Sequence, residues 1–80
     1  MSMIGKLYCD LFEAGNHYVH QQDGERITSR RVNSEKTVDI SNADGLFKVD
    51  DGLNEARFVP NDRRAVERIL EIIDDVSDAK

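Results

Sequence analysis

The chain has 80 residues, which leaves room for a single domain, and a domain this small buries only about 60% of the surface of its unfolded chain. Its net charge of −5 disfavours direct binding to nucleic acid or to an anionic membrane surface. One cysteine excludes an internal disulfide, and no apolar run approaches the ~20 residues of a membrane span. The lone cysteine and the lack of an apolar leader segment predict a cytoplasmic protein.

Residues 4–13 alternate apolar and polar side chains, and this alternation predicts a strand. Leu7, Cys9 and Leu11 would face the core. Five further segments have β character and are separated by turn residues: 17–22, 25–32, 37–40, 46–49 and 55–59. Asp23 and Gly24 predict a two-residue hairpin loop between the first two, because Asp-Gly sequences tolerate the positive φ angles of tight turns. We therefore expect four to six short antiparallel strands within residues 1–59.

Residues 60–80 predict one amphipathic helix, beginning at Asn61 or Asp62, either of which is a good N-cap. At the ~100° per residue of a helix, its apolar side chains fall on one arc: Ala65, Val66, Ile69, Leu70, Ile72, Ile73 and Val76. The expected fold class is α+β, a single domain over residues 1–80 in which this C-terminal helix, residues 60–78, packs on one face of the sheet. The expected core comprises Leu7, Cys9, Leu11, Val19, Ile27, Val38, Ile40, Phe47, Val49, Phe58, Ile69, Leu70, Ile73 and Val76.

The opposite face of this helix carries five acidic side chains, which we call the acidic ridge: Glu67, Glu71, Asp74, Asp75 and Asp78. On the helix itself, Arg63, Arg64 and Arg68 can reach only Glu67 and Glu71. The last two turns would then hold neighbouring like charges, each pair costing a few tenths of a kcal/mol, beside the negative end of the helix dipole. The ridge therefore carries a local cost for which the sequence shows no structural return.

The hypothesis that follows is a small non-enzymatic protein that occupies a basic surface of a partner protein. The acidic ridge would supply the charge, and Asp50, Asp51 and Glu55 would extend it. Carboxylates along a helix can imitate a row of phosphates and so take the place of a nucleic acid. In size and charge the chain resembles the small acidic inhibitors of host defence that phages encode, anti-CRISPR proteins included, although it carries no motif of such a family.

Two alternatives remain open. The first is a nucleic-acid-binding sheet whose face carries Tyr18, His20, Arg26, Arg30 and Arg31, with aromatic rings stacking on bases and arginines holding phosphates. The second is a structural or assembly subunit that associates with itself through an uncovered sheet face. A homodimer is compatible with any of these readings, because a marginal core gains stability from a second copy.

The sequence has no glycine-rich phosphate loop, no nucleophile elbow, no HExxH and no CxxC motif, and we expect neither an enzyme nor a catalytic residue. A calcium loop is disfavoured over residues 40–45, because Ile40 stands where the first acidic ligand belongs. His17 and His20 would point to opposite sides of a strand, so they do not form a metal pair. No metal or other cofactor is expected.

Overall fold

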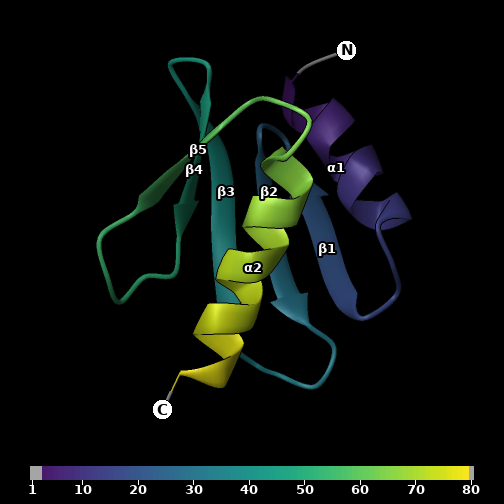
Figure 1. Cartoon of the computed structure of the whole chain (residues 1–80), viewed down its shortest axis with the longest axis vertical. Helices are drawn as coiled ribbons and strands as arrows, with labels where there is room; N and C mark the ends of the chain where they lie inside the picture. Colours follow the sequence, from purple (N-terminus) through teal and green to yellow (C-terminus); the bar gives the residue numbers. More distant parts are fainter. Residues whose placement is uncertain (1–2, 80) are drawn as a thin grey trace.

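The computed structural model describes residues 3–79 and shows an α+β fold (Figure 1). A helix opens the chain, five strands follow, and a second helix closes it. The elements are α1 (Met3–Glu13), β1 (Tyr18–Asp23), β2 (Arg26–Arg31), β3 (Thr37–Ala43), β4 (Leu46–Asp50), β5 (Arg57–Pro60) and α2 (Ala65–Asp78).

The five strands form one antiparallel sheet in the order β1-β2-β3-β4-β5, so each strand pairs with its neighbour in the chain. Two-residue turns join β1 to β2 and β3 to β4. Between β3 and β4, Asp44 and Gly45 both have positive φ, 52° and 84°, as a two-residue turn that follows the twist of the strands requires. Between β1 and β2 the loop consists of Gly24 and Glu25, one residue later than expected, because Asp23 still pairs with Arg26.

Both helices lie on the same face of the sheet, α2 across its middle and α1 on the β1 side (Figure 1). Each contributes an apolar stripe to one core. From α1 come Ile4, Leu7 and Leu11, and from α2 come Ala65, Ile69, Ile73 and Val76. The sheet contributes Ile27, Val38, Ile40, Phe47, Val49 and Val59. The other face of the sheet carries no element among residues 3–79, and we call it the open face.

The strand predicted over residues 4–13 is wrong, because this segment forms helix α1. Leu7 and Leu11 satisfy both a strand and a helix pattern, but Ile4 joins them only at helical spacing. The helix therefore buries one more large side chain than the strand would. It also turns Cys9 away from the core, so the prediction of a buried cysteine is wrong as well.

Two further residues expected in the core are exposed, because their strands turn the other set of alternate side chains towards the core. Val19 in β1 is 40% exposed and Phe58 in β5 is 54% exposed. Residues directly opposite in an antiparallel pair share a face, and inward-facing Ile27 lies opposite Gln22. His20 therefore faces inward and Val19 outward. Phe47 in turn lies opposite Val59, which takes the core position instead of Phe58.

Helix α2 begins later than expected and is preceded by a turn. The Asp62 carboxylate accepts a hydrogen bond from the N–H of Arg64, 2.8 Å away, and the Asp62 carbonyl accepts one from Ala65. This side-chain bond closes a turn instead of capping the helix, so regular helix starts only at Ala65. Lys80, included in the expected helix, lies outside the described residues. Leu70, expected in the core, is half-buried at the edge of the apolar stripe.

Candidate functional site

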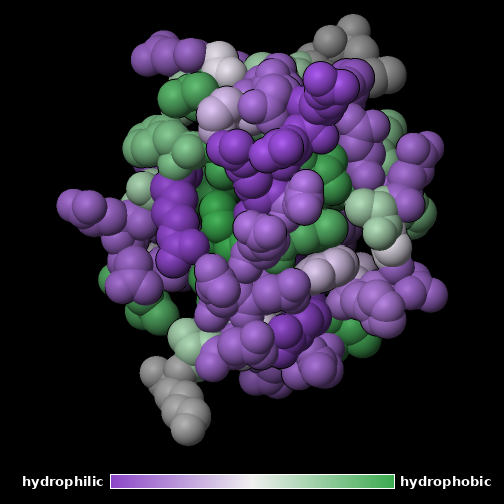
Figure 2. All heavy atoms as spheres, in the orientation of Figure 1, coloured by the Kyte–Doolittle hydropathy of each residue, from purple (hydrophilic) through white to green (hydrophobic). Residues whose placement is uncertain are grey.

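The acidic ridge is divided by the way in which α2 sits on the sheet. Because Ala65, Ile69, Ile73 and Val76 face the core, Asp74 and Asp75 lie on opposite flanks of the helix, close to the sheet. The other three acids project from the outer side: Glu67, Glu71 and Asp78. Figure 2 shows a hydrophilic band along the front of the molecule, where α2 lies, with hydrophobic side chains visible on both sides of it.

One flank of the helix is held by Arg31 from β2. Its guanidinium lies 3.4 Å from Asp74 Oδ1 and 2.7 Å from Asp78 Oδ1. The hydrogen bond and charge of Arg31 lower the pKa of the Asp78 carboxyl. The hydrogen bond to Asp78 likewise raises the pKa of Arg31. The guanidinium is further held by Asn33, whose Oδ1 accepts a hydrogen bond from Nε over 2.8 Å. Arg31 thus fixes the C-terminal half of α2 to the sheet.

Further contacts complete this attachment. The Tyr18 hydroxyl donates to the Asp74 carboxylate at 3.0–3.1 Å, and burial, together with this hydrogen bond, raises the pKa of Tyr18. On the opposite flank, Arg57 lies 3.6 Å from Asp75. Lys36 donates to the carbonyl of Ala79 at the end of the helix. The negative end of the helix dipole therefore has cations beside it, but they come from the sheet and its loops.

Glu67 and Glu71 differ from the other ridge acids, because neither forms an ion pair within residues 3–79. The pairs expected with Arg63, Arg64 and Arg68 are also missing from that range. Both glutamates are exposed. They lie four residues apart, which is about 6 Å along the helix, so they are neighbours on its outer side. They form the part of the ridge that the fold does not use.

The expected extension of the ridge, Asp50, Asp51 and Glu55, lies in and next to the loop between β4 and β5. Asp51 accepts hydrogen bonds from the N–H groups of Leu53 and Asn54, which lower its pKa to about 2. Asp50 accepts one from Gly52. These two carboxylates shape the loop, and Glu55 is exposed without an ion pair among the described residues.

The residues expected to form a nucleic-acid-binding face do not share a face. Tyr18, His20 and Arg31 point towards the helices, whereas Arg26 and Arg30 lie on the open face. Arg26 pairs with Asp39 at 3.2 Å, and Arg30 donates to main-chain carbonyls at the end of β2 and in the loop that follows it. The open face also balances Arg26, Arg30 and Lys48 against Asp23, Asp39 and Asp50. It therefore carries no surplus of positive charge to attract phosphates.

A buried polar pair lies between β1 and β2 and had no signal in the sequence. His20 Nδ1 is 2.7 Å from Ser29 Oγ, and burial lowers the pKa of His20. A histidine beside a serine hydroxyl is the arrangement that activates a nucleophile. Here, however, the exposed fraction of Ser29 is 0%, so no substrate atom can reach its hydroxyl. The pair joins the two strands.

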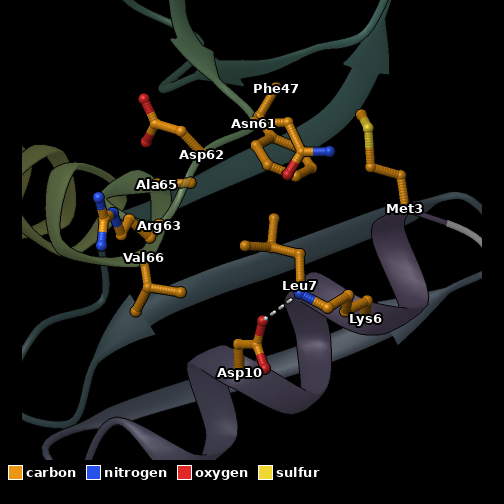
Figure 3. Close-up of a pocket in the computed structure, with 10 residues that line it drawn as sticks. All are labelled: Met3, Lys6, Leu7, Asp10, Phe47, Asn61, Asp62, Arg63, Ala65 and Val66. Atoms are coloured by element: carbon orange, nitrogen blue, oxygen red, sulfur yellow. Dashed lines mark ion pairs between the residues drawn. The ribbon is translucent and has the colours of Figure 1, made fainter.

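A groove lies between α1 and the start of α2 and has a volume of about 840 Å³ (Figure 3). Leu7, Phe47 and Val66 form its apolar floor. Its rim holds Lys6 in an ion pair with Asp10 at 3.5 Å, and Asp62 next to Arg63. Two cations and two anions give the rim no preference for ligand charge. The groove could not be predicted from the sequence, since it requires α1 to be a helix.

Within residues 3–79, no three side chains of His, Cys, Asp or Glu lie close enough together to hold a metal ion. Neither described helix has the length and hydropathy needed to cross a membrane. Comparison with protein-family models, curated proteins and solved structures finds no match to this chain.

Proposed function

We propose that the protein is a non-enzymatic binding module that uses the outer side of α2 to occupy a basic surface of a partner protein. One observation supports the proposal above the others. Glu67 and Glu71 project from the same side of the helix without a basic partner in residues 3–79, whereas Asp74, Asp75 and Asp78 pair with arginines of the sheet. Three of the five ridge acids thus have a structural use, and the other two do not.

The chemistry of such a contact is a set of charge-assisted hydrogen bonds from lysine or arginine side chains to the two glutamates. Asp78 lies further along the same side, its side chain is 68% exposed, and its bond to Arg31 uses one oxygen. The net charge of −5 would speed the encounter with a basic partner, and salt would weaken it.

A capture experiment from the native host lysate tests the proposal. In the variant Glu67→Lys/Glu71→Lys each substitution adds two positive charges, so the net charge rises from −5 to −1. The contacts that hold α2 are not altered. The matched control, Glu25→Lys/Glu35→Lys, makes the same charge change at two exposed sites elsewhere. Wild type and control should capture the same protein, nuclease or not. The ridge variant should lose about tenfold or more in affinity, roughly 1.4 kcal/mol.

Equal losses in both variants would mean that only net charge matters, which contradicts a site on α2. Capture abolished by nuclease would point to bound nucleic acid instead. Asp74 and Asp78 are deliberately left intact, because reversing their charge would break the attachment of α2 and confuse unfolding with loss of binding.

A further inference from the structure

A second candidate surface lies at the outer edge of β1, where a recess opens between this strand and the connection from α1. Three exposed apolar side chains, Phe12, Val19 and Val32, line the recess. They are half of the six large apolar side chains that are exposed within residues 3–79. Their exposed fractions are 67%, 40% and 55%. Such a concentration of apolar surface at one site is typical of a binding surface.

The wall of this recess also contains a polar atom without a partner. His20 lines the recess, is 9% exposed, and its Nε2 forms no hydrogen bond within residues 3–79. If the Ser29 hydroxyl donates its proton to Nδ1 of neutral His20, the proton of the imidazole ring lies on Nε2. The reverse arrangement leaves the buried Ser29 proton without an acceptor. Nε2 is therefore a buried N–H that lacks an acceptor, such as a carbonyl oxygen.

The main chain of β1 also has N–H and C=O groups that point to this outer edge and do not bond to β2. Val32 donates its N–H to the carbonyl of His17, so the odd-numbered residues of β1 bond to β2. The N–H and C=O groups of Tyr18, His20 and Gln22 consequently point to the outer edge, where no strand among residues 3–79 lies. The opposite edge differs, because β5 has only four residues and ends at Pro60, which has no N–H to offer.

We infer that the outer edge of β1 binds an extended segment of a partner protein, which adds a strand to the sheet and places one apolar side chain in the recess. Carbonyl groups of that segment would accept hydrogen bonds from the β1 amides, and His20 Nε2 in the wall of the recess offers one further donor. Glu13 also lines the recess and has no ion pair among the described residues, which favours a segment with a lysine or arginine beside its apolar residue.

A second copy of the chain suits this edge less well. Residues 18–23 contain no lysine or arginine to face Glu13, and two copies would bring two net charges of −5 together. The inference does not depend on the acidic ridge, since Glu67 and Glu71 lie on α2 and do not line the recess.

A phage-displayed library of random peptides provides the probe, selected against the intact protein. Selected peptides should carry an apolar residue next to a basic one. Phe12→Ser should weaken their binding by about tenfold or more, and Phe58→Ser, which removes an aromatic ring of similar exposure from the open face, should leave it unchanged. Glu67→Lys/Glu71→Lys should also leave it unchanged, which separates this surface from the one proposed above.

Amide hydrogen exchange supplies the second measurement. In the free protein the amides of Tyr18, His20 and Gln22 should exchange faster than those of Val19 and Gln21, which bond to β2. Bound peptide should slow the first set by roughly tenfold or more. The inference is overturned if no peptide is selected, if Phe58→Ser has the same effect as Phe12→Ser, or if exchange at β1 does not change. A dimer by light scattering, in which the amides of Tyr18, His20 and Gln22 are already protected without peptide, would assign this edge to a second copy instead.

Discussion

Both halves of α2 carry acidic side chains, and the halves differ in what those acids do. In the C-terminal half, Asp74, Asp75 and Asp78 pair with Arg31 and Arg57 from the sheet. In the N-terminal half, Glu67 and Glu71 have no ion pair within residues 3–79. The comparison teaches that local repulsion along a helix does not by itself reveal function. The proposal of a protein partner rests only on the carboxylates left over after tertiary pairing.

Removal of an apolar contact should have the largest effect, because both halves of α2 depend on the same stripe. Ile73 is 1% exposed, and Ile73→Ala should lower the free energy of unfolding by about 2–5 kcal/mol. Leu70→Ala should cost less, since Leu70 is only half-buried. Urea denaturation followed by circular dichroism measures both. If Leu70→Ala proves the more damaging, the orientation assigned to α2 is incorrect.

Loss of the Arg31 contacts should come next and should affect only the C-terminal half. Arg31→Gln removes the cation that pairs with Asp74 and Asp78, so it should destabilise the protein less than Ile73→Ala and more than any change at Glu67 or Glu71. A double-mutant cycle with Asp78→Asn should show that the two substitutions are not additive. Additive effects would mean that the ion pair contributes nothing to holding the helix.

The pH dependence of stability should reveal the buried side of β1, where His20 stacks on the Tyr18 ring that holds Asp74. Burial lowers the pKa of His20 from 6.5, so the unfolded chain takes up a proton first. This contribution to stability is complete above pH 6.5 and is lost as the pH falls towards the lower pKa of the folded state. Thermal melts between pH 5 and 8 should therefore show lower stability at the acid end, and His20→Gln should flatten that slope.

The smallest effect should follow changes at the unpaired glutamates. Glu71→Gln removes a like-charge neighbour of Asp74 and Asp75, so the free energy of unfolding should change by no more than roughly 0.5 kcal/mol, towards greater stability. Thermal denaturation compared with wild type is sufficient. A large destabilisation would show that Glu71 has a structural partner after all, and the contrast between the two halves of the helix would disappear.

Sequence periodicity was sufficient for the apolar stripe of α2 and for strands β2, β3 and β4, because Ile27, Val38, Ile40, Phe47 and Val49 all lie in the core as expected. It was not sufficient for α1, since Leu7 and Leu11 fit either period. Periodicity also failed to predict which side chains of β1 and β5 face the core. The pairing of these strands with the strands of Ile27 and Phe47 decides that.

The candidate site was predictable only in part. The acids of α2 could be read from the helix pattern, but their partners could not. Tyr18 is 56 residues away from Asp74, and Arg31 is 43 residues away from it, so no local pattern links them. The recess beside β1 requires α1 to be a helix and β1 to have its observed phase, and neither was available from periodicity.

The strictly sequential order of the strands has a consequence for how the protein folds. Every strand pairs with the one before it, so the sheet can grow hairpin by hairpin with short loop closures, which favours rapid folding. The core over the middle of the sheet forms only later, because Ile69 and Ile73 of α2 follow all the strands in the chain. During synthesis a nearly complete sheet would therefore wait, with part of its apolar face still exposed, until α2 leaves the ribosome.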